Sequence, residues 1–133
     1  MKKIKFKSFK KKSGTLIPFS LKKSFPIKVK RIFLINGKKN FIRGDHAHKK
    51  CSQFLFPVLG KMKIEYVSKK EKGSIVLDYT KKEGYLLKPK TWCGIKFLTQ
   101  NAILLVACDM EYKFNDYIEN YSEFLKIIKR KNS

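Results

Sequence analysis

The sequence has no apolar run long enough to cross a bilayer. Its longest, Ala102–Cys108, is seven residues, against the roughly 20 that a membrane-spanning helix needs. Residues 1–12 alternate lysine with apolar residues, and we therefore expect no secretory signal there. The three cysteines, Cys51, Cys93 and Cys108, form no C-x-x-C pair and are too few for a disulfide framework. These absences predict a reduced, cytoplasmic protein with no membrane partner.

Negative charge and arginine are also scarce. Lys+Arg number 32 against 10 Asp+Glu, which gives a net charge of +22, but the only arginines are Arg31, Arg43 and Arg130. A charge of this size suggests nucleic acid. Specific recognition of bases and phosphates, however, favours the arginine fork over the point charge of lysine, and the lysines are spread along the whole chain. We therefore expect a solvated basic surface and no nucleic-acid partner, and an anionic ligand fits either way.

What the chain does contain predicts one all-β domain over residues 1–133. Its length suits a single domain, and 43% hydrophobic residues are enough for a core. Short apolar or alternating stretches between turn residues predict strands at 3–9, 15–19, 29–35, 53–59, 61–67, 74–79, 84–88, 95–98 and 102–108. Gly37 is able to take a positive φ in the turn predicted at 36–40, and Pro57 is expected to lie at a sheet edge or a bulge.

The C-terminal part follows a different period. Over residues 115–130, apolar side chains recur at the spacing of an amphipathic helix: Tyr117, Ile118, Tyr121, Phe124, Leu125 and Ile128. Asn115 is expected to cap this helix, with acidic residues near its start and basic residues near its end. We therefore predict a helix that covers one side of a β-barrel or sandwich.

The two histidines lie close together, in the string R-G-D-H-A-H-K-K at residues 43–50. Side chains of a strand alternate between faces, so His46 and His48 are predicted to share one face, and Asp45 and Ala47 the other. Such a pair is often merely exposed near a loop. Inside a barrel it is suited to proton transfer, because imidazole titrates near neutral pH.

The residues around these histidines resemble the cupin motifs. Gln53 stands at the position of the cupin glutamate, Gly60 at the closing glycine, and Gly94 at the last metal-binding histidine of the second motif. The resemblance implies a small cupin, or jelly-roll, β-barrel with a C-terminal amphipathic helix. A cupin metal site uses three histidines and a glutamate, of which this chain keeps two. Cys93 stands beside the missing position, but a mixed His/Cys site needs unusual geometry, so we expect no metal and no cofactor.

A longer set of strings, covering about residues 8–128, resembles the cupin-type dTDP-sugar 3,4-ketoisomerases. In order, these are S-G-T-L at 13–16, K-R-I-F-L-I at 30–35, R-G-D-H-A-H-K-K at 43–50, G-Y-L-L-K-P-K-T-W at 84–92, L-V-A-C-D-M-E-Y at 105–112 and D-Y-I-E-N-Y-S-E-F at 116–124. The resemblance implies a metal-independent isomerase that converts dTDP-4-oxo-6-deoxy-D-glucose to a dTDP-3-oxo-6-deoxyhexose through an enediol(ate). The product is expected to feed amino-sugar synthesis for surface glycans such as lipopolysaccharide O-antigen.

The resemblance also implies roles for the catalytic residues. His46 matches the base that takes the C3 proton, and His48 its partner in proton relay or hydrogen bonding. Arg43 matches an arginine that holds the diphosphate with two parallel hydrogen bonds.

Four further residues are expected in the substrate or nucleotide site. Arg31 either assists the nucleotide or makes a structural ion pair, and Gln53 bonds either the sugar or a histidine. Lys49 follows the histidines. Phe33 stands where the family has a tyrosine, so the role of that phenol does not carry over.

The resemblance implies a homodimer in which an N-terminal strand within residues 1–12 is exchanged between subunits. It leaves the C4 configuration of the product open, because Ser13 and Cys93 stand at positions that vary with it in the family and neither indicates a configuration. Three alternatives also stay open: a noncatalytic sugar-binding cupin, a 3,5-epimerase and a nucleic-acid-binding protein. The H-x-H-K-K arrangement argues against the epimerase, which commonly uses a separate histidine and aspartate.

Overall fold

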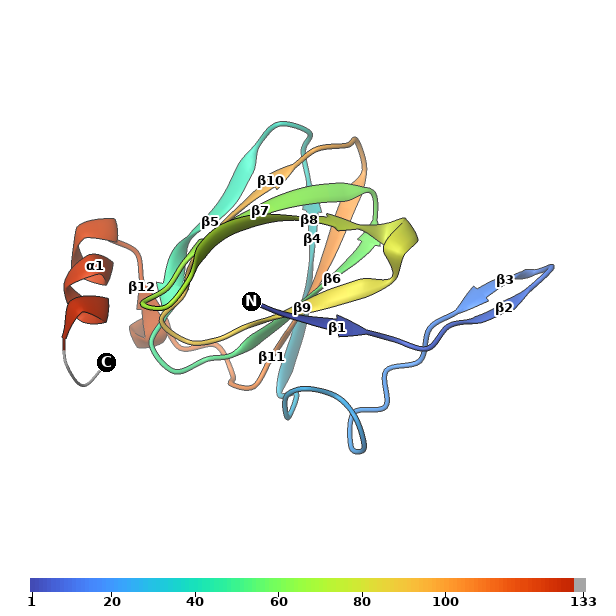
Figure 1. Cartoon of the computed structure of the whole chain (residues 1–133), viewed down its shortest axis with the longest axis horizontal. Helices are drawn as coiled ribbons and strands as arrows, with labels where there is room; N and C mark the ends of the chain where they lie inside the picture. Colours follow the sequence, from blue (N-terminus) through green and yellow to red (C-terminus); the bar gives the residue numbers. More distant parts are fainter. Residues whose placement is uncertain (131–133) are drawn as a thin grey trace.

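The computed structural model describes residues 1–130 and shows two antiparallel sheets packed face to face (Figure 1). The first has the order β1-β9-β6-β11-β4, comprising Lys2–Lys5, Glu83–Leu87, Gln53–Leu59, Ala102–Cys108 and Arg31–Gly37. The second has the order β12-β5-β10-β7-β8, comprising Tyr117–Ile118, Ile42–His48, Trp92–Phe97, Lys61–Val67 and Lys72–Asp78. From β4 onward the chain crosses between the sheets at almost every step, which is the jelly-roll arrangement that the cupin resemblance implies. The all-β prediction is confirmed.

The inner faces of the sheets fill one end of this sandwich with apolar side chains. Leu55, Met62, Ile64, Phe97 and Leu104 come from four different strands, and each is at most 1% exposed. Because side chains alternate along a strand, each strand places every second residue in this layer. Burying a side chain of this size contributes roughly 1.5–3 kcal/mol, so the filled end supplies much of the stability.

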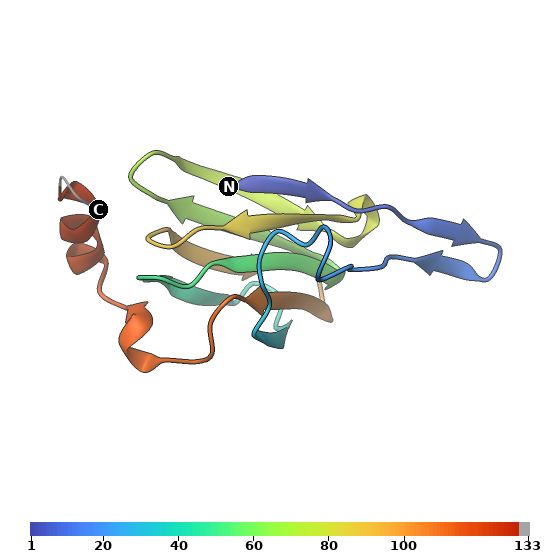
Figure 2. The same ribbon diagram turned by 90° about the horizontal axis from the view of Figure 1, so that it is seen from below.

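Strand β6 is apolar on both faces, and the N-terminal segment explains why. Leu55 packs in the core between the sheets, whereas Phe54 and Phe56 belong to a second cluster on the outer face. Three phenylalanines of the N-terminal segment lie against them, with ring centroids 4.8 to 6.3 Å apart: Phe6, Phe19 and Phe25. The chain then continues outward as the hairpin β2 (Phe9–Lys11) and β3 (Gly14–Leu16), which projects beyond the sheets (Figure 2).

The predicted strands 53–59, 61–67 and 102–108 are confirmed end to end as β6, β7 and β11, and the others are shifted by a few residues. The prediction for 3–9 is wrong as one strand, because β1 ends at Lys5, where its pairing with β9 stops, and β2 begins at Phe9. The strand predicted at 15–19 ends at Leu16, because the chain then turns back toward the outer aromatic cluster.

Pro57 lies at a bulge, as predicted, because Leu104 pairs with Pro57 and the next pair skips a residue of β6. In the predicted turn at 36–40, the positive φ that Gly37 could take is found at Asn40 instead, at 71°. Glycine is needed at position 37 for another reason, since a Cβ there would lie 2.2 Å from the ring of Phe97.

The C-terminal helix is shorter than the predicted range of 115–130. α1 spans Tyr121–Lys129, and its N-cap is Asn120, whose side chain accepts a hydrogen bond from the Glu123 N–H, rather than Asn115. A 3₁₀ turn, Phe114–Asp116, and strand β12 precede it, because residues 117–118 pair with β5. Within residues 1–130, no helix has the length and apolar character to span a bilayer.

Candidate active site

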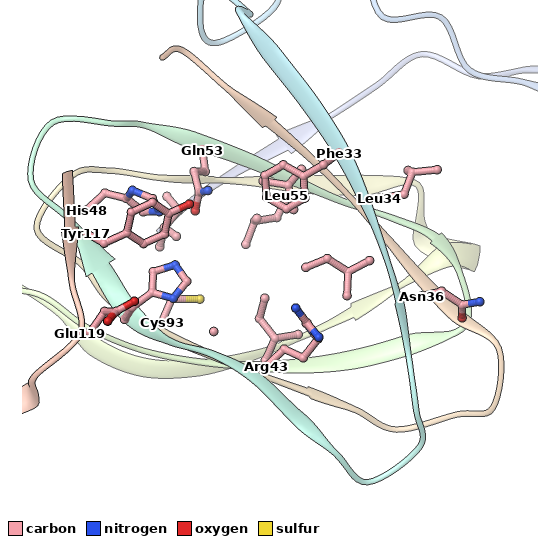
Figure 3. Close-up of a pocket in the computed structure, with 16 residues that line it drawn as sticks. Phe33, Leu34, Asn36, Arg43, His48, Gln53, Leu55, Cys93, Tyr117 and Glu119 are labelled. Atoms are coloured by element: carbon pink, nitrogen blue, oxygen red, sulfur yellow. The ribbon is translucent and has the colours of Figure 1, made fainter. Parts of the chain in front are cut away.

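A cavity of about 570 Å³ lies between the two sheets, and residues of both sheets line it (Figure 3). Five of the predicted site residues line it: Phe33, Arg43, His46, His48 and Gln53. Cys93, Tyr117 and Glu119 add to its walls. The structure thus brings most of the predicted polar residues together in one hollow.

A bulge in β5 keeps both histidines on the cavity side. Gly44 and Asp45 take positive φ values of 87° and 55°, and the pairing with β10 passes from Gly44 to His46 and skips Asp45. A side chain at Gly44 would not fit, since its Cβ would lie 2.9 Å from the carbonyl oxygen of Cys93. The rings of His46 and His48 meet nearly at right angles, with centroids 5.1 Å apart. The predicted shared face is confirmed.

His48 is anchored by a carboxylate behind it. Its Nδ1 lies 3.0 Å from Oδ2 of Asp116, and both side chains are buried. The carboxylate also accepts hydrogen bonds from the backbone N–H groups of Lys50, at 2.8 Å, and Cys51, at 3.3 Å. An acceptor at Nδ1 assigns the ring proton to that atom. The other nitrogen, Nε2, then carries a lone pair, is buried and has no partner within residues 1–130.

Burial favours the neutral form of both histidines. Desolvation lowers the pKa of His48 below its ordinary 6.5, opposed by the hydrogen bond with Asp116. Desolvation also lowers the pKa of His46, opposed by its hydrogen bond to the Gly44 backbone. Both rings are therefore mainly neutral near pH 7, the state in which a ring nitrogen accepts a proton.

Three residues at or behind the cavity were not predicted from the sequence as site residues. Tyr117 packs against both histidines, with ring centroids 4.4 Å from His48 and 5.0 Å from His46. Glu119 lines the cavity, and Asp116 anchors His48 from behind. All three lie in the string at 116–124, and the helical period assigned them to a helix. The pairing of Tyr117 with His48 places them at the site instead.

Arg31 lies behind the cavity lining. It makes no ion pair with any carboxylate of the described chain; instead its Nη2 donates to the sulfur of Cys108 at 3.6 Å. Its guanidinium also lies over the rings of Phe33 and Tyr112, 5.2 and 5.5 Å from their centroids. Of the two expectations for Arg31, the structure gives no support to the structural ion pair.

Gln53 and Lys49 are placed differently from each other. Gln53 is buried at the cavity wall and donates to Cys108 Sγ at 3.5 Å, rather than to a histidine. The hydrogen bond with the Cys51 thiol lowers the pKa of Cys108, and the bonds from Arg31 and Gln53 lower it further. Lys49 is exposed and does not line the cavity; its backbone N–H donates to the carbonyl of Asp116.

The cavity does not fit a cupin metal. Gln53 offers a neutral amide that is already engaged with sulfur, and a Cβ on Gly94 would point at Oδ1 of Asp45, 2.7 Å away. The residue of β10 that lines the cavity beside His46 is instead Cys93, whose thiol is kept protonated because burial raises its pKa to about 12. A different trio, His48, Cys51 and Asp116, has potential ligand atoms within 4.8 Å of one another. There the Nδ1–carboxylate hydrogen bond occupies two of the three groups.

Taken together, the fold and cavity define a cupin-like sandwich with an anchored histidine pair in a pocket large enough for part of a nucleotide sugar. The chain matches the family described as FdtA: WxcM-like, C-terminal, over residues 1–129, and it belongs to that family.

Several proteins similar to this chain are sugar 3,4-ketoisomerases, also called 3,4-oxoisomerases. The TDP-4-oxo-6-deoxy-α-D-glucose-3,4-oxoisomerase of Aneurinibacillus thermoaerophilus is 28% identical over 133 residues, covering 97% of this chain and 93% of the relative. The 3,4-ketoisomerase QdtA of Thermoanaerobacterium thermosaccharolyticum is 31% identical, with a TM-score of 0.90. The match covers 98% of this chain and 94% of QdtA, which was solved as a histidine-to-asparagine variant with TDP-4-keto-6-deoxyglucose. A 3,4-ketoisomerase of Helicobacter canadensis is 31% identical with a TM-score of 0.89, covering 97% of both chains. The chain is an isomerase of this kind.

Proposed function

We propose that this protein converts dTDP-4-oxo-6-deoxyglucose to a dTDP-3-oxo-6-deoxyhexose by proton transfer between C3 and C4. The observation that carries the proposal is the geometry of His48, a residue of the cavity lining: Nδ1 is bonded to Asp116, and Nε2 is buried with no hydrogen-bond partner among residues 1–130. The substrate assignment is supported by the relatives, one named for this sugar and another solved with it bound.

The reaction needs a base and a proton donor beside the sugar, and the two histidines supply both. Removal of the C3 proton, made acidic by the C4 carbonyl, gives an enediolate; return of a proton to C4 and loss of the C3 hydroxyl proton complete the shift. Both histidines face one cavity, so a single sugar lying beside them can be served at two adjacent carbons. No electron donor or acceptor is required, because the oxidation at C3 equals the reduction at C4.

The geometry favours His48, rather than His46, as the base at C3. Asp116 holds its ring in one tautomer and stabilises the imidazolium that forms when Nε2 takes a proton, as carboxylates behind catalytic histidines do. His46 is half-buried and has a hydrogen bond to the backbone of Gly44 rather than to a carboxylate. We therefore assign the second proton transfer, at C4, to His46, which reverses the assignment expected from the sequence.

We assign binding of the diphosphate of the substrate to Arg43. Arg43 lies on the exposed part of β5 and lines the cavity apart from the histidines (Figure 3). Its planar fork suits two oxygens of a diphosphate. Phe33 supplies an apolar wall across from it, where a sugar or base packs without a phenol.

A homodimer is part of the proposal. The hairpin β2–β3 projects from the body and leaves Phe9 and Leu16 exposed at 56% and 61%. Strand β4 ends the first sheet, and its outward side chains Ile32 and Leu34 are also exposed. Apolar side chains on a projecting hairpin and on an edge strand suit contact with a second copy, which supports exchange of the N-terminal segment. We place this enzyme in the cytoplasm, making a 3-oxo sugar for amine transfer and use in surface glycans.

The decisive experiment is NMR of dTDP-4-oxo-6-deoxyglucose incubated with the protein in deuterium oxide. We expect a 3-oxo product with deuterium at C4, and exchange at C3 of recovered substrate. Saturable binding of the sugar nucleotide with no exchange would favour the noncatalytic sugar-binding cupin. Inversion at C3 or C5 with the carbonyl still at C4 would favour an epimerase.

A further inference from the structure

A second hollow, of about 360 Å³, lies outside the histidine cavity and shares no lining residue with it. Its walls come from the turn at 68–71 between β7 and β8, the loop at 88–91 between β9 and β10, and the start of the chain. The pairing of Trp92 with Val67 sets this loop and turn side by side. The hollow is therefore built from segments that the second sheet holds in register.

Positive charge dominates this hollow. Five of its lining residues are lysines: Lys2, Lys69, Lys70, Lys88 and Lys90. None of these five ammonium groups pairs with a carboxylate of residues 1–130. The single acidic lining residue, Glu71, is paired with the N-terminal ammonium. That hydrogen bond, the charge of the N-terminal ammonium and, last, the charge of Lys88 lower the pKa of Glu71, so a single carboxylate, already bonded to the N-terminus, faces the five lysines.

Thr91 adds a hydroxyl to the wall of the hollow. The residue is 7% exposed, and its hydroxyl makes no hydrogen bond within the described part of the chain. A hydroxyl that lines a hollow and has no protein partner can donate a hydrogen bond to an oxyanion bound there.

The loop that carries two of the lysines is fixed. Lys90 has a positive φ of 59°, and its backbone N–H donates to the carbonyl of His48 at 2.6 Å. Pro89 restricts the residue before it. Lys88 and Lys90 are therefore presented from a rigid turn, which reduces the conformational entropy that binding an anion would cost.

We propose that this basic hollow, defined by the five lysines and Thr91, binds a multiply charged phosphate group. Five ammonium groups around one concavity, with Glu71 as the one carboxylate among its described lining residues, suit a diphosphate or triphosphate better than a single carboxylate. The same chemistry is offered by a free oligophosphate and by a phosphorylated lipid headgroup. The inference does not depend on the isomerase reaction.

The test measures binding of inorganic tripolyphosphate by calorimetry at physiological salt, with dTDP present at saturation to occupy the histidine cavity. We expect one site per chain. The double variant Lys88→Gln/Lys90→Gln should weaken binding at least about tenfold, because each charged hydrogen bond to phosphate is strong. Lys22→Gln/Lys23→Gln, an exposed pair in the N-terminal segment with the same loss of charge, is the matched control and should change affinity by less than twofold.

If both double variants weakened tripolyphosphate binding equally, the binding would come from diffuse surface charge, and the proposal would be overturned. It would also be overturned if the protein bound neither tripolyphosphate nor the vesicles described next. A second arm uses vesicles of phosphatidylcholine with and without phosphatidylinositol 4,5-bisphosphate. Vesicle binding that requires phosphatidylinositol 4,5-bisphosphate, Lys88 and Lys90, without binding of tripolyphosphate, identifies a lipid headgroup as the source; tripolyphosphate binding without vesicle binding identifies a soluble oligophosphate. Thr91→Val tests the hydroxyl in the wall of the hollow, and we expect it to weaken binding while both histidine side chains titrate as before.

Discussion

The two ends of the sandwich are made by the same strands and differ in what they place inside. Strand β10 carries Phe97 at the filled end, where it is fully buried, and Cys93 at the cavity end, beside His46. Strand β11 likewise carries Leu104 at the filled end and Val106 at the cavity wall. One end is closed by apolar contacts, and the other keeps about 570 Å³ open around polar groups.

This difference shows how a small protein keeps a buried polar site. A neutral histidine and a carboxylate are costly to bury unless they bond to each other, and His48 and Asp116 do so. The apolar end supplies the stability that the cavity end lacks. Substitutions at the cavity end should therefore change catalysis more than stability, and substitutions at the filled end should do the reverse.

The largest effect on catalysis is expected from His48→Asn. It removes the group assigned as the C3 base, and we expect kcat to fall by at least the roughly 10²–10⁴-fold that positioned acid–base catalysis supplies. Exchange of the C3 proton, followed by NMR in deuterium oxide, should be lost with turnover, while dTDP affinity changes little; the melting temperature is measured in parallel, because buried Asp116 loses its bond to the His48 ring. Near-normal C3 exchange would show that His48 is not the base.

His46→Asn is the matched comparison, on the same strand and cavity face. We expect it to impair product formation as strongly but to leave measurable C3 exchange, because the first proton transfer needs only His48. Loss of exchange in His46→Asn with its retention in His48→Asn would restore the assignment expected from the sequence.

Asp116→Asn should reduce kcat by at least about tenfold, but by less than loss of His48, since the base remains while its tautomer is no longer fixed by a carboxylate. Asp116 raises the pKa of His48, so the variant should also shift the acid limb of the pH–kcat/KM profile to lower pH. A merely structural carboxylate would not shift that limb, and Asp116→Glu should restore part of the rate.

At the filled end, Phe97→Ala should destabilise the fold by about 3–5 kcal/mol, because it leaves a cavity among fully buried side chains. Denaturant unfolding measures this, and kcat of the protein that remains folded should stay close to that of the parent. Val76→Ala, on a side chain that is 47% exposed, is the control and should cost well under 1 kcal/mol. A loss of kcat in folded Phe97→Ala would break the separation between the ends.

The sequence predicted the filled end better than the cavity end. Strands such as β6 and β11 were found from local apolar patterns, and His46 and His48 from their spacing and the family strings. Asp116 and Tyr117 were assigned to a helix because local periodicity cannot detect that residues 117–118 pair with a strand some 70 positions earlier. Likewise, only the register between β5 and β10 shows that Cys93, and not Gly94, lines the cavity.

The histidine pair also gives the cavity end a pH dependence that the filled end lacks. Burial lowers both pKa values below 6.5, so below about pH 6.5 the unfolded chain binds more protons than the folded one. The unfolding free energy should therefore be maintained above pH 6.5 and fall as pH decreases through the folded-state values. Denaturant titrations between about pH 7 and 5.5 measure this slope, and the double variant His46→Asn/His48→Asn should flatten it. An unchanged slope would place the titrating groups elsewhere.

The smallest expected effect is that of metal removal. Gln53 and Cys93 occupy the cavity where a cupin would place metal ligands, and neither is available as one, because the amide bonds to Cys108 and the Cys93 thiol stays protonated. Exhaustive chelation, followed by assay in metal-free buffer, should leave kcat within about twofold, since positioned acid–base groups act without a Lewis acid. Among residues 1–130, one trio resembles a ligand set, His48, Cys51 and Asp116, and it suggests the informative control. If zinc enters there it must displace the Nδ1 proton, so added zinc should inhibit rather than activate, and Cys51→Ser should reduce that inhibition. Activity lost on chelation and restored by one divalent ion would instead make the cavity a metal site.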